Sequence, residues 1–188
     1  MVHLPCPTAQ LIKEEADKFD QENSLDEEAL GLLFSQFPGN KALPEVLLKV
    51  IALNKLYGAG VRDPHISAVA RHIAGIAGLD ALLQQGSPDA AERIIDCKEV
   101  KRNYFSFASK YCSWHNPDAF AIYSSEIDAC LWRYREQDNF TKYRRGSYDY
   151  REFLRIMNAF RNHYGLTSIG FKDLDKFLLA HGARLLLR

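Results

Sequence analysis

The chain has 188 residues, of which 47% are hydrophobic and 12% aromatic, and its 24 Lys+Arg balance its 24 Asp+Glu. This composition excludes a disordered chain, and the sequence has no run of 18 uncharged apolar residues that would predict a membrane-spanning helix. At the N-terminus no basic segment precedes an apolar stretch, so we expect a cytoplasmic protein without a membrane partner.

Apolar residues recur at helical spacing through the first half of the chain, and no run alternates with period two. Thr8 is the expected N-cap of a first helix, and Ser24 with Glu27 three residues later fits a capping box for the second. Pro44 suits the first turn of a third helix. The helices expected here are 8–23, 24–37, 44–58, 66–75, 80–85 and 88–96.

The second half continues this pattern, so the predicted fold class is all-α. The sequence of residues 116–118, Asn-Pro-Asp, predicts a turn after a buried helix. Gly182 is the expected terminator of the last helix. The helices expected in this half are 104–114, 125–135, 150–164 and 172–181, with a loop rich in Lys, Arg and Tyr before the third of them.

Charge is distributed unevenly along the chain. Residues 1–100 hold 9 Lys+Arg against 15 Asp+Glu, and residues 101–188 hold 15 against 9. We therefore expect residues 1–188 to form a single compact unit with two lobes, an acidic one over 1–97 and a basic one over 98–188.

The basic half also concentrates aromatic side chains. Cations that bind phosphates and aromatic rings that stack on bases are typical of a nucleic-acid surface. The alternative is a solvated edge that pairs with the acidic half. The residues concerned are Arg133, Arg135, Lys142, Arg144, Arg145, Arg151 and Arg155, with Trp132, Tyr134, Tyr143, Tyr148 and Tyr150.

The four cysteines are widely spaced, and none has a second Cys or a His at the spacing of metal ligands. We expect buried free thiols and no metal site. No four-cysteine cluster motif is present near the C-terminus, so we expect no cofactor.

Residues 105–131 are consistent with an apolar helix, a polar turn and the start of another helix. This stretch resembles the helix-hairpin-helix superfamily of DNA glycosylases, especially its adenine-mismatch branch. In those enzymes a helix with small residues is followed by a turn, a Pro-Ile-Leu step and the catalytic Asp at the head of the next helix. Here residues 121–125 stand in the place of Pro-Ile-Leu-Asp-Gly, and Ser124, 16 positions after Ala108, stands in the place of the Asp.

The chain is also similar to a set of uncharacterised bacterial proteins that share patterns such as "LN.LY", "YSFASKYCSFHNP..YPIYDS" and "LDKYLW". The matching pieces of this chain lie at residues 53–57, 105–125 and 174–178, and a further piece lies at 69–73. In that set an Asp again occupies the position of Ser124.

The resemblance implies a two-lobed helical bundle with a cleft between the lobes. It also implies a monofunctional enzyme that hydrolyses the N-glycosidic bond of a flipped damaged or modified base in DNA, in repair or in phage defence. Bifunctional members carry a Lys nucleophile where this chain has Ser106, so Schiff-base chemistry is not expected, and Lys110 is the alternative amine.

A serine cannot supply the negative charge that stabilises an oxocarbenium-like sugar, nor act as a general base near neutral pH. Three explanations of Ser124 remain open: an engineered substitution, a natural loss of activity, or the use of another carboxylate. The other carboxylates near it in sequence are Asp118, Glu126 and Asp128.

The resemblance implies further site residues, although packing in the core is the alternative role of each aromatic one. Where the superfamily has a glycine-rich hairpin, residues 97–103 lack glycine, so we expect lysine and arginine to contact phosphate by charge instead. The candidates for the catalytic site are Ser124 and Lys110; for the substrate pocket Asn54, Tyr57, Tyr111, Trp114, His115 and Tyr123; and for DNA binding Lys101, Arg102, Arg144 and Arg145.

We expect double-stranded DNA as the partner and a monomeric protein. The competing hypothesis is a non-catalytic helical module that binds nucleic acid or protein. A third is a toxin- or antitoxin-like interaction protein, whose DNA affinity should be negligible and insensitive to salt.

Overall fold

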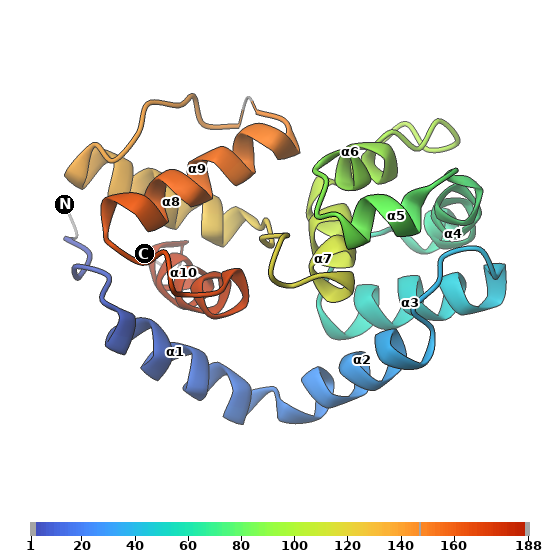
Figure 1. Ribbon diagram of the computed structural model, residues 1–188, viewed down its shortest axis with the longest axis horizontal. Coiled ribbons are helices and arrows are strands. Elements are labelled where there is room, and N and C mark those ends of the chain that lie inside the picture. The colour runs from blue at the N-terminus through green and yellow to red at the C-terminus, as the bar shows by residue number, and fades with distance from the viewer. Residues whose placement is uncertain (1–2, 147, 187–188) are drawn as a thin grey trace. The chain divides into compact units, whose positions relative to one another are not determined.

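A computed structural model describes residues 3–146 and 148–186, and every regular element in these ranges is a helix (Figure 1). The all-α prediction is therefore confirmed for this part of the chain. Two compact units are present: unit 1 comprises residues 1–22 and 121–188, and unit 2 comprises residues 23–120. None of the helices within the described ranges is long and apolar enough to cross a membrane.

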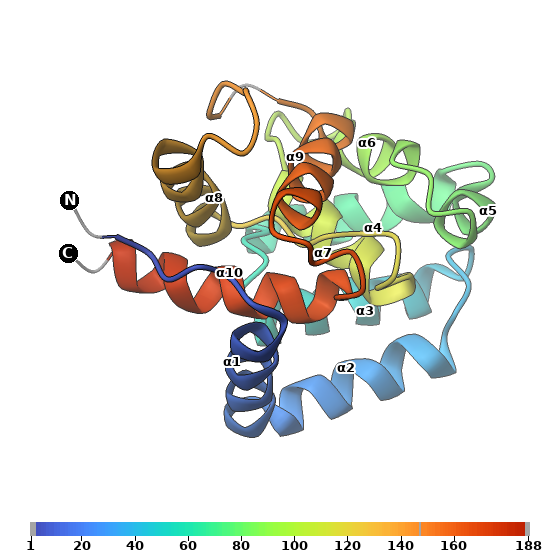
Figure 2. The same ribbon diagram turned by 60° about the vertical axis from the view of Figure 1, so that its left-hand side comes forward.

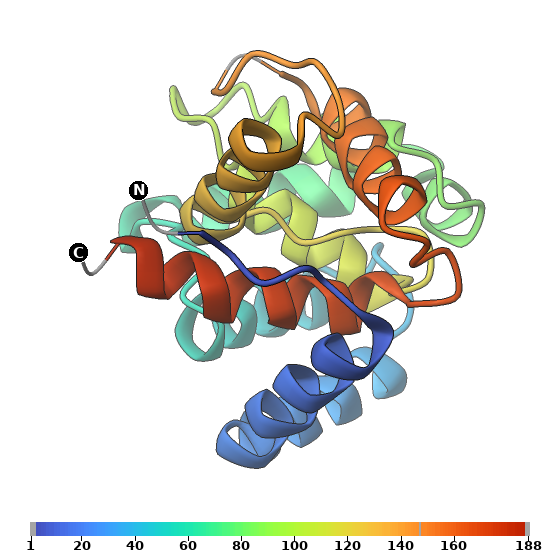
Figure 3. The same cartoon turned by 90° about the vertical axis from the view of Figure 1, so that its left-hand side faces the viewer.

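Unit 1 holds the helices α1 (Ala9–Glu22), α8 (Ser125–Asp138), α9 (Tyr150–His163) and α10 (Phe171–Leu186). Helix α10 packs against both α8 and α1, and its course can be followed in Figures 2 and 3. Phe177 and Leu178 of α10 are fully buried, and α9 is amphipathic, with Phe153 and Phe160 on its buried face. The core of unit 1 therefore surrounds α10.

Unit 2 holds six helices and one turn of 3-10 helix among its residues. Helix α7 is buried from Phe107 to Ser113 and packs against α2, α3, α5 and α6, so the core of unit 2 surrounds α7. The elements are α2 (Ser24–Gln36), α3 (Leu43–Leu56), η1 (Asp63–His65), α4 (Ile66–Gly75), α5 (Leu79–Gln84), α6 (Asp89–Ile95) and α7 (Phe105–His115).

Local sequence signals set several helix ends as predicted. The Thr8 hydroxyl accepts a hydrogen bond from the Leu11 amide at 3.2 Å at the start of α1, and Pro44 lies in the first turn of α3. After α7 the chain turns at residues 116–118, where the Asn116 side chain donates to the Leu83 carbonyl at 2.9 Å.

The predicted capping box at the start of α2 is wrong. Ser24 is the first residue inside α2, and the N-cap residue Asn23 makes no side-chain capping hydrogen bond. The Glu27 carboxylate accepts a hydrogen bond from the Tyr57 hydroxyl at 2.5 Å. This partner of Glu27 lies 30 positions away in the chain.

Gly182 does not terminate the last helix, because α10 continues to Leu186. A Cβ atom at position 182 would lie 1.9 Å from the carbonyl oxygen of Glu126, which is in the first turn of α8. Gly182 therefore allows α10 and α8 to approach backbone to backbone, a packing role rather than a capping role.

The predicted single unit with a lobe boundary near residue 98 differs from the observed division, which falls at 22/23 and 120/121. Residue 98 lies inside unit 2, between α6 and α7, and these two helices pack against each other. The change in net charge near residue 98 therefore does not coincide with a boundary between the two units.

Cys97, Cys112 and Cys130 are buried and Cys6 is exposed, and all four are free thiols. Burial raises the pKa of the Cys112 and Cys130 thiols far above its ordinary value, which favours the unreactive protonated form. Across the described residues no group of three or more His, Cys, Asp or Glu side chains could hold a metal ion.

Candidate functional site

Ser124 lies at the head of α8, after the α7 helix, the turn and residues 120–123, which lie outside any helix or strand. It is the N-cap residue, with φ −148° and ψ 168°, and its hydroxyl accepts a hydrogen bond from the Ile127 amide at 3.2 Å. The residue is buried, with 8% of its surface exposed. Position 124 is thus at a helix N-terminus, where the helix dipole favours a negative charge.

The backbone that leads to Ser124 is held by two other helices of unit 1. The Ile122 amide donates to the Asp175 carboxyl group on α10 at 2.6 Å, and the Tyr150 hydroxyl on α9 donates to the Ala121 carbonyl at 2.8 Å. Together with the close approach at Gly182, these bonds fix the start of α8 relative to α9 and α10.

Asp175 is a buried acid, only 3% exposed, that no sequence motif singled out as a site residue. Its Oδ2 atom accepts from Ile122, whereas its Oδ1 atom has no hydrogen-bond partner in the described part of the chain. Burial raises the pKa of this carboxyl group well above its usual range, and the Ile122 amide and the Lys176 ammonium offset only part of that effect. Burial therefore shifts Asp175 toward its neutral form, and this carboxyl group binds the amide of Ile122, two residues before Ser124 in the chain.

Three carboxylates lie near Ser124 in sequence, namely Asp118, Glu126 and Asp128, and their surroundings differ. Asp128 is buried, and its two oxygens accept hydrogen bonds from Arg145 Nε at 2.5 Å and from the Tyr148 hydroxyl. Glu126 accepts a bond from the Ser125 hydroxyl at 3.1 Å, and Asp118 is exposed in the turn. Asp128 serves to hold the loop after α8, since its charge is already compensated by Arg145.

Three of the predicted pocket and catalytic residues come together in unit 2. Lys110 on α7 donates to the Tyr57 carbonyl at 3.0 Å, and its ammonium lies 6.0 Å from the centre of the Tyr57 ring. The Trp114 ring meets the Tyr57 ring edge to face at 5.7 Å. With Glu27, which accepts from the Tyr57 hydroxyl, they form the Tyr57 cluster, a group of two aromatic rings, an ammonium and a carboxylate.

Tyr111 and His115 belong to a deeper group around Lys49, a fully buried lysine that no sequence motif marks as a site residue. The Lys49 ammonium donates to the Phe37 and Gly39 carbonyls at 3.0 and 2.8 Å. It also donates to the Asn40 side-chain oxygen at 2.8 Å, which accepts from the Tyr111 hydroxyl as well. Tyr111 is therefore a core residue of this Lys49 centre rather than a surface for stacking.

Burial lowers the pKa of Lys49 to about 8, although nearby Asp80 and Glu45 act in the opposite direction. His115 Nε2 lies 3.3 Å from the Lys49 ammonium. Burial lowers the pKa of His115 to about 3, with the Lys49 charge as a smaller contribution, so the imidazole is neutral at physiological pH.

The two remaining pocket candidates have structural contacts. The Asn54 side chain forms two hydrogen bonds with the backbone of Val61, at 2.8 and 2.7 Å, and so holds the loop after α3. Tyr123 belongs to unit 1, where its ring contacts Tyr148 at 6.2 Å and Phe153 at 5.4 Å, both edge to face. These contacts match the core-packing alternative.

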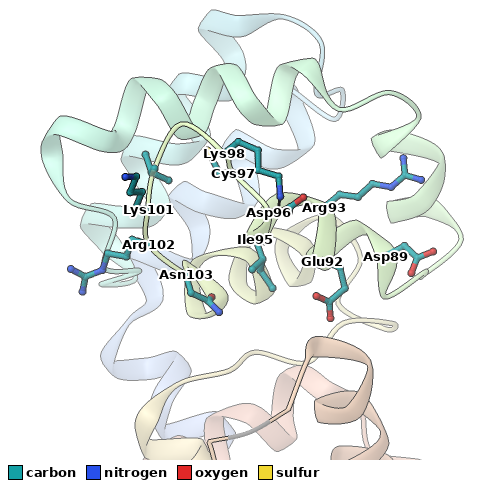
Figure 4. Close-up of a pocket in the computed structure, with 11 residues that line it drawn as sticks. Asp89, Glu92, Arg93, Ile95, Asp96, Cys97, Lys98, Lys101, Arg102 and Asn103 are labelled. Atoms are coloured by element: carbon teal, nitrogen blue, oxygen red, sulfur yellow. Dashed lines mark hydrogen bonds and ion pairs between the residues drawn. The ribbon is translucent and has the colours of Figure 1, made fainter.

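Lys101 and Arg102 lie on the segment between α6 and α7, beside a hollow of about 840 Å³ (Figure 4). Both are exposed, and neither forms an ion pair with any residue that the structure describes. By contrast, Lys98 on the same segment is paired with Asp96. These two cations are thus available to an anionic partner.

Arg144 and Arg145 lie in the loop between α8 and α9 of unit 1 and differ from each other. Arg145 is bound to Asp128, as described above, although 43% of its side chain is exposed. Arg144 is exposed, and within the described ranges it has no ion pair. Of this predicted pair, Arg144 is the one whose charge is uncompensated.

The predicted site residues are therefore divided between the units. Unit 2 brings Tyr57, Lys110 and Trp114 together in the Tyr57 cluster, and Tyr111 and His115 together in the Lys49 centre. Unit 1 holds Ser124, Tyr123, Arg144 and Arg145. The structure adds three residues that were not among the predicted ones: Glu27, Lys49 and Asp175. Each of them contacts a partner that is distant in sequence.

With this geometry defined, comparison with known proteins shows the family. Residues 11–119, more than half of the chain, match the family model HI_0787_N, which describes an N-terminal domain. The chain belongs to this family. It is also 29% identical to an uncharacterized protein of Haemophilus influenzae, over 86% of this chain and 84% of that protein. No solved structure matches the chain.

Proposed function

We propose that this protein is a monofunctional DNA glycosylase-like protein that binds double-stranded DNA and holds a flipped damaged or modified base. The observation that carries the proposal is the position of residue 124. It caps α8 after a buried helix, a turn and a short irregular segment, 16 positions after the buried Ala108. This is the place of the catalytic Asp in the glycosylases that the segment resembles. The fold would then be of the helix-hairpin-helix type, with α6 and α7 as the helix pair.

The chemistry explains why this position matters. Hydrolysis of an N-glycosidic bond develops positive charge on the sugar, and a carboxylate fixed at a helix N-terminus stabilises that charge without reorganisation. The bonds from Asp175 and Tyr150 to the step before Ser124 supply such fixation. The Ser124 hydroxyl supplies the position without the charge, so the proposal expects base release to depend on a carboxylate at position 124.

Lys110 supports the monofunctional form of the proposal. A Schiff-base nucleophile attacks as a free amine. The Lys110 ammonium instead donates to the Tyr57 carbonyl and lies by the Tyr57 ring. In the proposal Lys110 therefore orders the Tyr57 cluster within unit 2 and does not act as a nucleophile.

The test is an assay for abasic sites on duplexes that carry damaged, mismatched and hypermodified bases. It compares the protein as it stands with Ser124→Asp, which retains an N-cap oxygen. The matched control is Ser125→Asp, which adds the same charge one residue further, at an exposed position. We expect base release with Ser124→Asp alone, and duplex binding with all three proteins. Absence of both release and binding from every protein would contradict the proposal.

The second candidate function is a non-catalytic nucleic-acid-binding module, in repair or phage defence without base release. The observation that favours it is the pairing of Asp128 with Arg145 and Tyr148, which leaves no uncompensated buried carboxylate in the first turns of α8. In the same assay this function predicts salt-dependent duplex binding and no base release from any of the three proteins.

A further inference from the structure

Tyr104, the residue before α7, joins two segments of unit 2 that are far apart in sequence. Its hydroxyl lies 2.5 Å from His65 Nδ1 and accepts a bond from the Arg62 amide at 3.4 Å. The Arg102 guanidinium lies 6.0 Å from the centre of the Tyr104 ring. The turn that contains η1 and the segment between α6 and α7 are thereby held side by side.

The accessible side chains of these two segments include three cations, Arg62, Lys101 and Arg102, and one acid in the turn, Asp63. His65 is partly exposed. None of the three cations forms an ion pair with a described residue, whereas Glu99 of the same segment is already paired with Arg71 at 3.3 Å. We name Arg62, His65, Lys101 and Arg102 the Tyr104 patch.

We propose that the Tyr104 patch binds the phosphate backbone of duplex DNA, with Arg62 and His65 adding a second segment to the contacts expected of Lys101 and Arg102. This inference rests on the proposed function, because it takes duplex DNA as the partner. Its new content is that the turn at residues 62–65, which no motif marked, is part of the DNA-binding surface.

Two physical arguments favour phosphate as the ligand. Arginine presents a planar fork of donors that matches phosphate, and a guanidinium near an aromatic ring loses less freedom on binding than one free in solvent. Cations supplied by two separate segments can also contact successive phosphates, which a single exposed side chain cannot do. Tyr104 is buried and keeps the two segments in register, so it acts as a positioning residue.

The experiment measures the affinity of a fluorescent duplex by anisotropy, as a function of salt, for Arg62→Gln, Arg102→Gln and the double variant. Each lost phosphate contact should lower the slope of log K against log salt by about 0.9 and weaken binding by roughly three- to ten-fold at moderate salt. The control is Lys41→Gln, which removes the same charge from another exposed position of unit 2. Tyr104→Phe, which keeps the ring, should weaken binding and leave the salt slope nearer the original value than the arginine variants do.

The outcomes separate this inference from the proposed function. If Arg62→Gln binds like Lys41→Gln while Arg102→Gln binds more weakly, the inference fails and the proposed function stands. If the unmodified protein shows no salt-dependent binding of duplex DNA, both fail. A thermal melt of each variant checks that the fold is intact, which is expected because Arg62 and Arg102 are exposed.

Discussion

The two units each bury an ionisable side chain, and the two differ in how completely it is paired. Lys49 in unit 2 donates to three oxygens, so its ammonium has a partner for every hydrogen. Asp175 in unit 1 accepts one amide bond and has one oxygen without a partner in the described ranges. A fully paired charge fixes a fold, whereas a partly paired acid next to a candidate site retains capacity for a further hydrogen bond.

Lys49→Met should have the largest effect. It removes the donor for the partly buried Phe37 and Gly39 carbonyls, so the free energy of unfolding should fall by about 2–3 kcal/mol. Urea unfolding measures the change. Lys41→Met, an exposed lysine of the same unit, is the control and should change stability by less than about 0.5 kcal/mol. A loss below about 1 kcal/mol for Lys49→Met would show that the Lys49 centre does not hold the fold.

His115 should make the stability of the protein sensitive to acid. Its folded pKa of about 3 lies below the ordinary value of 6.5, so between these values the unfolded chain binds a proton that the folded chain does not. The contribution of His115 to the free energy of unfolding should therefore be fully present above pH 6.5. It should fall with decreasing pH, by at most roughly 1.4 kcal/mol per pH unit. In pH-dependent unfolding, His115→Gln should flatten this slope and the exposed His3→Gln should not; equal slopes would contradict the prediction.

Asp175→Asn should have the smallest effect and the opposite pH dependence. Because burial raises the pKa of Asp175, the folded chain keeps a proton that the unfolded chain loses, and stability falls as pH rises above the ordinary carboxyl range. The amide removes that loss and can still accept from Ile122, so we expect a gain of about 1 kcal/mol at neutral pH. The control is Asp173→Asn, an exposed acid on the same helix. A loss at neutral pH would indicate that the ionised form of Asp175 is needed.

The sequence predicted features whose cause is local. Helical spacing of apolar residues defines the all-α fold, the Thr8 hydroxyl caps α1, and residues 116–118 form the expected turn. The position of residue 124 at the head of α8 also followed from local spacing. Each of these depends on residues within one or two helical turns of one another.

Features set by distant partners could not be predicted. Glu27 accepts a hydrogen bond from Tyr57, 30 positions away, and Asp175 accepts one from Ile122, 53 positions away. Lys49 lies in a largely apolar helix, and its burial becomes evident only from the three-dimensional structure. The charge difference between the halves of the chain was likewise real but did not mark the division into units.

The geometry of the candidate site at Ser124 depends on the glycine at position 182. Because a methyl group at position 182 would collide with the backbone of Glu126, the single hydrogen of glycine sets the spacing at which the first turn of α8 rests on α10. A substitution there would displace the neighbours of Ser124 without touching Ser124 itself. The surroundings of position 124 therefore depend on residue 182 as well as on the residue at position 124 itself.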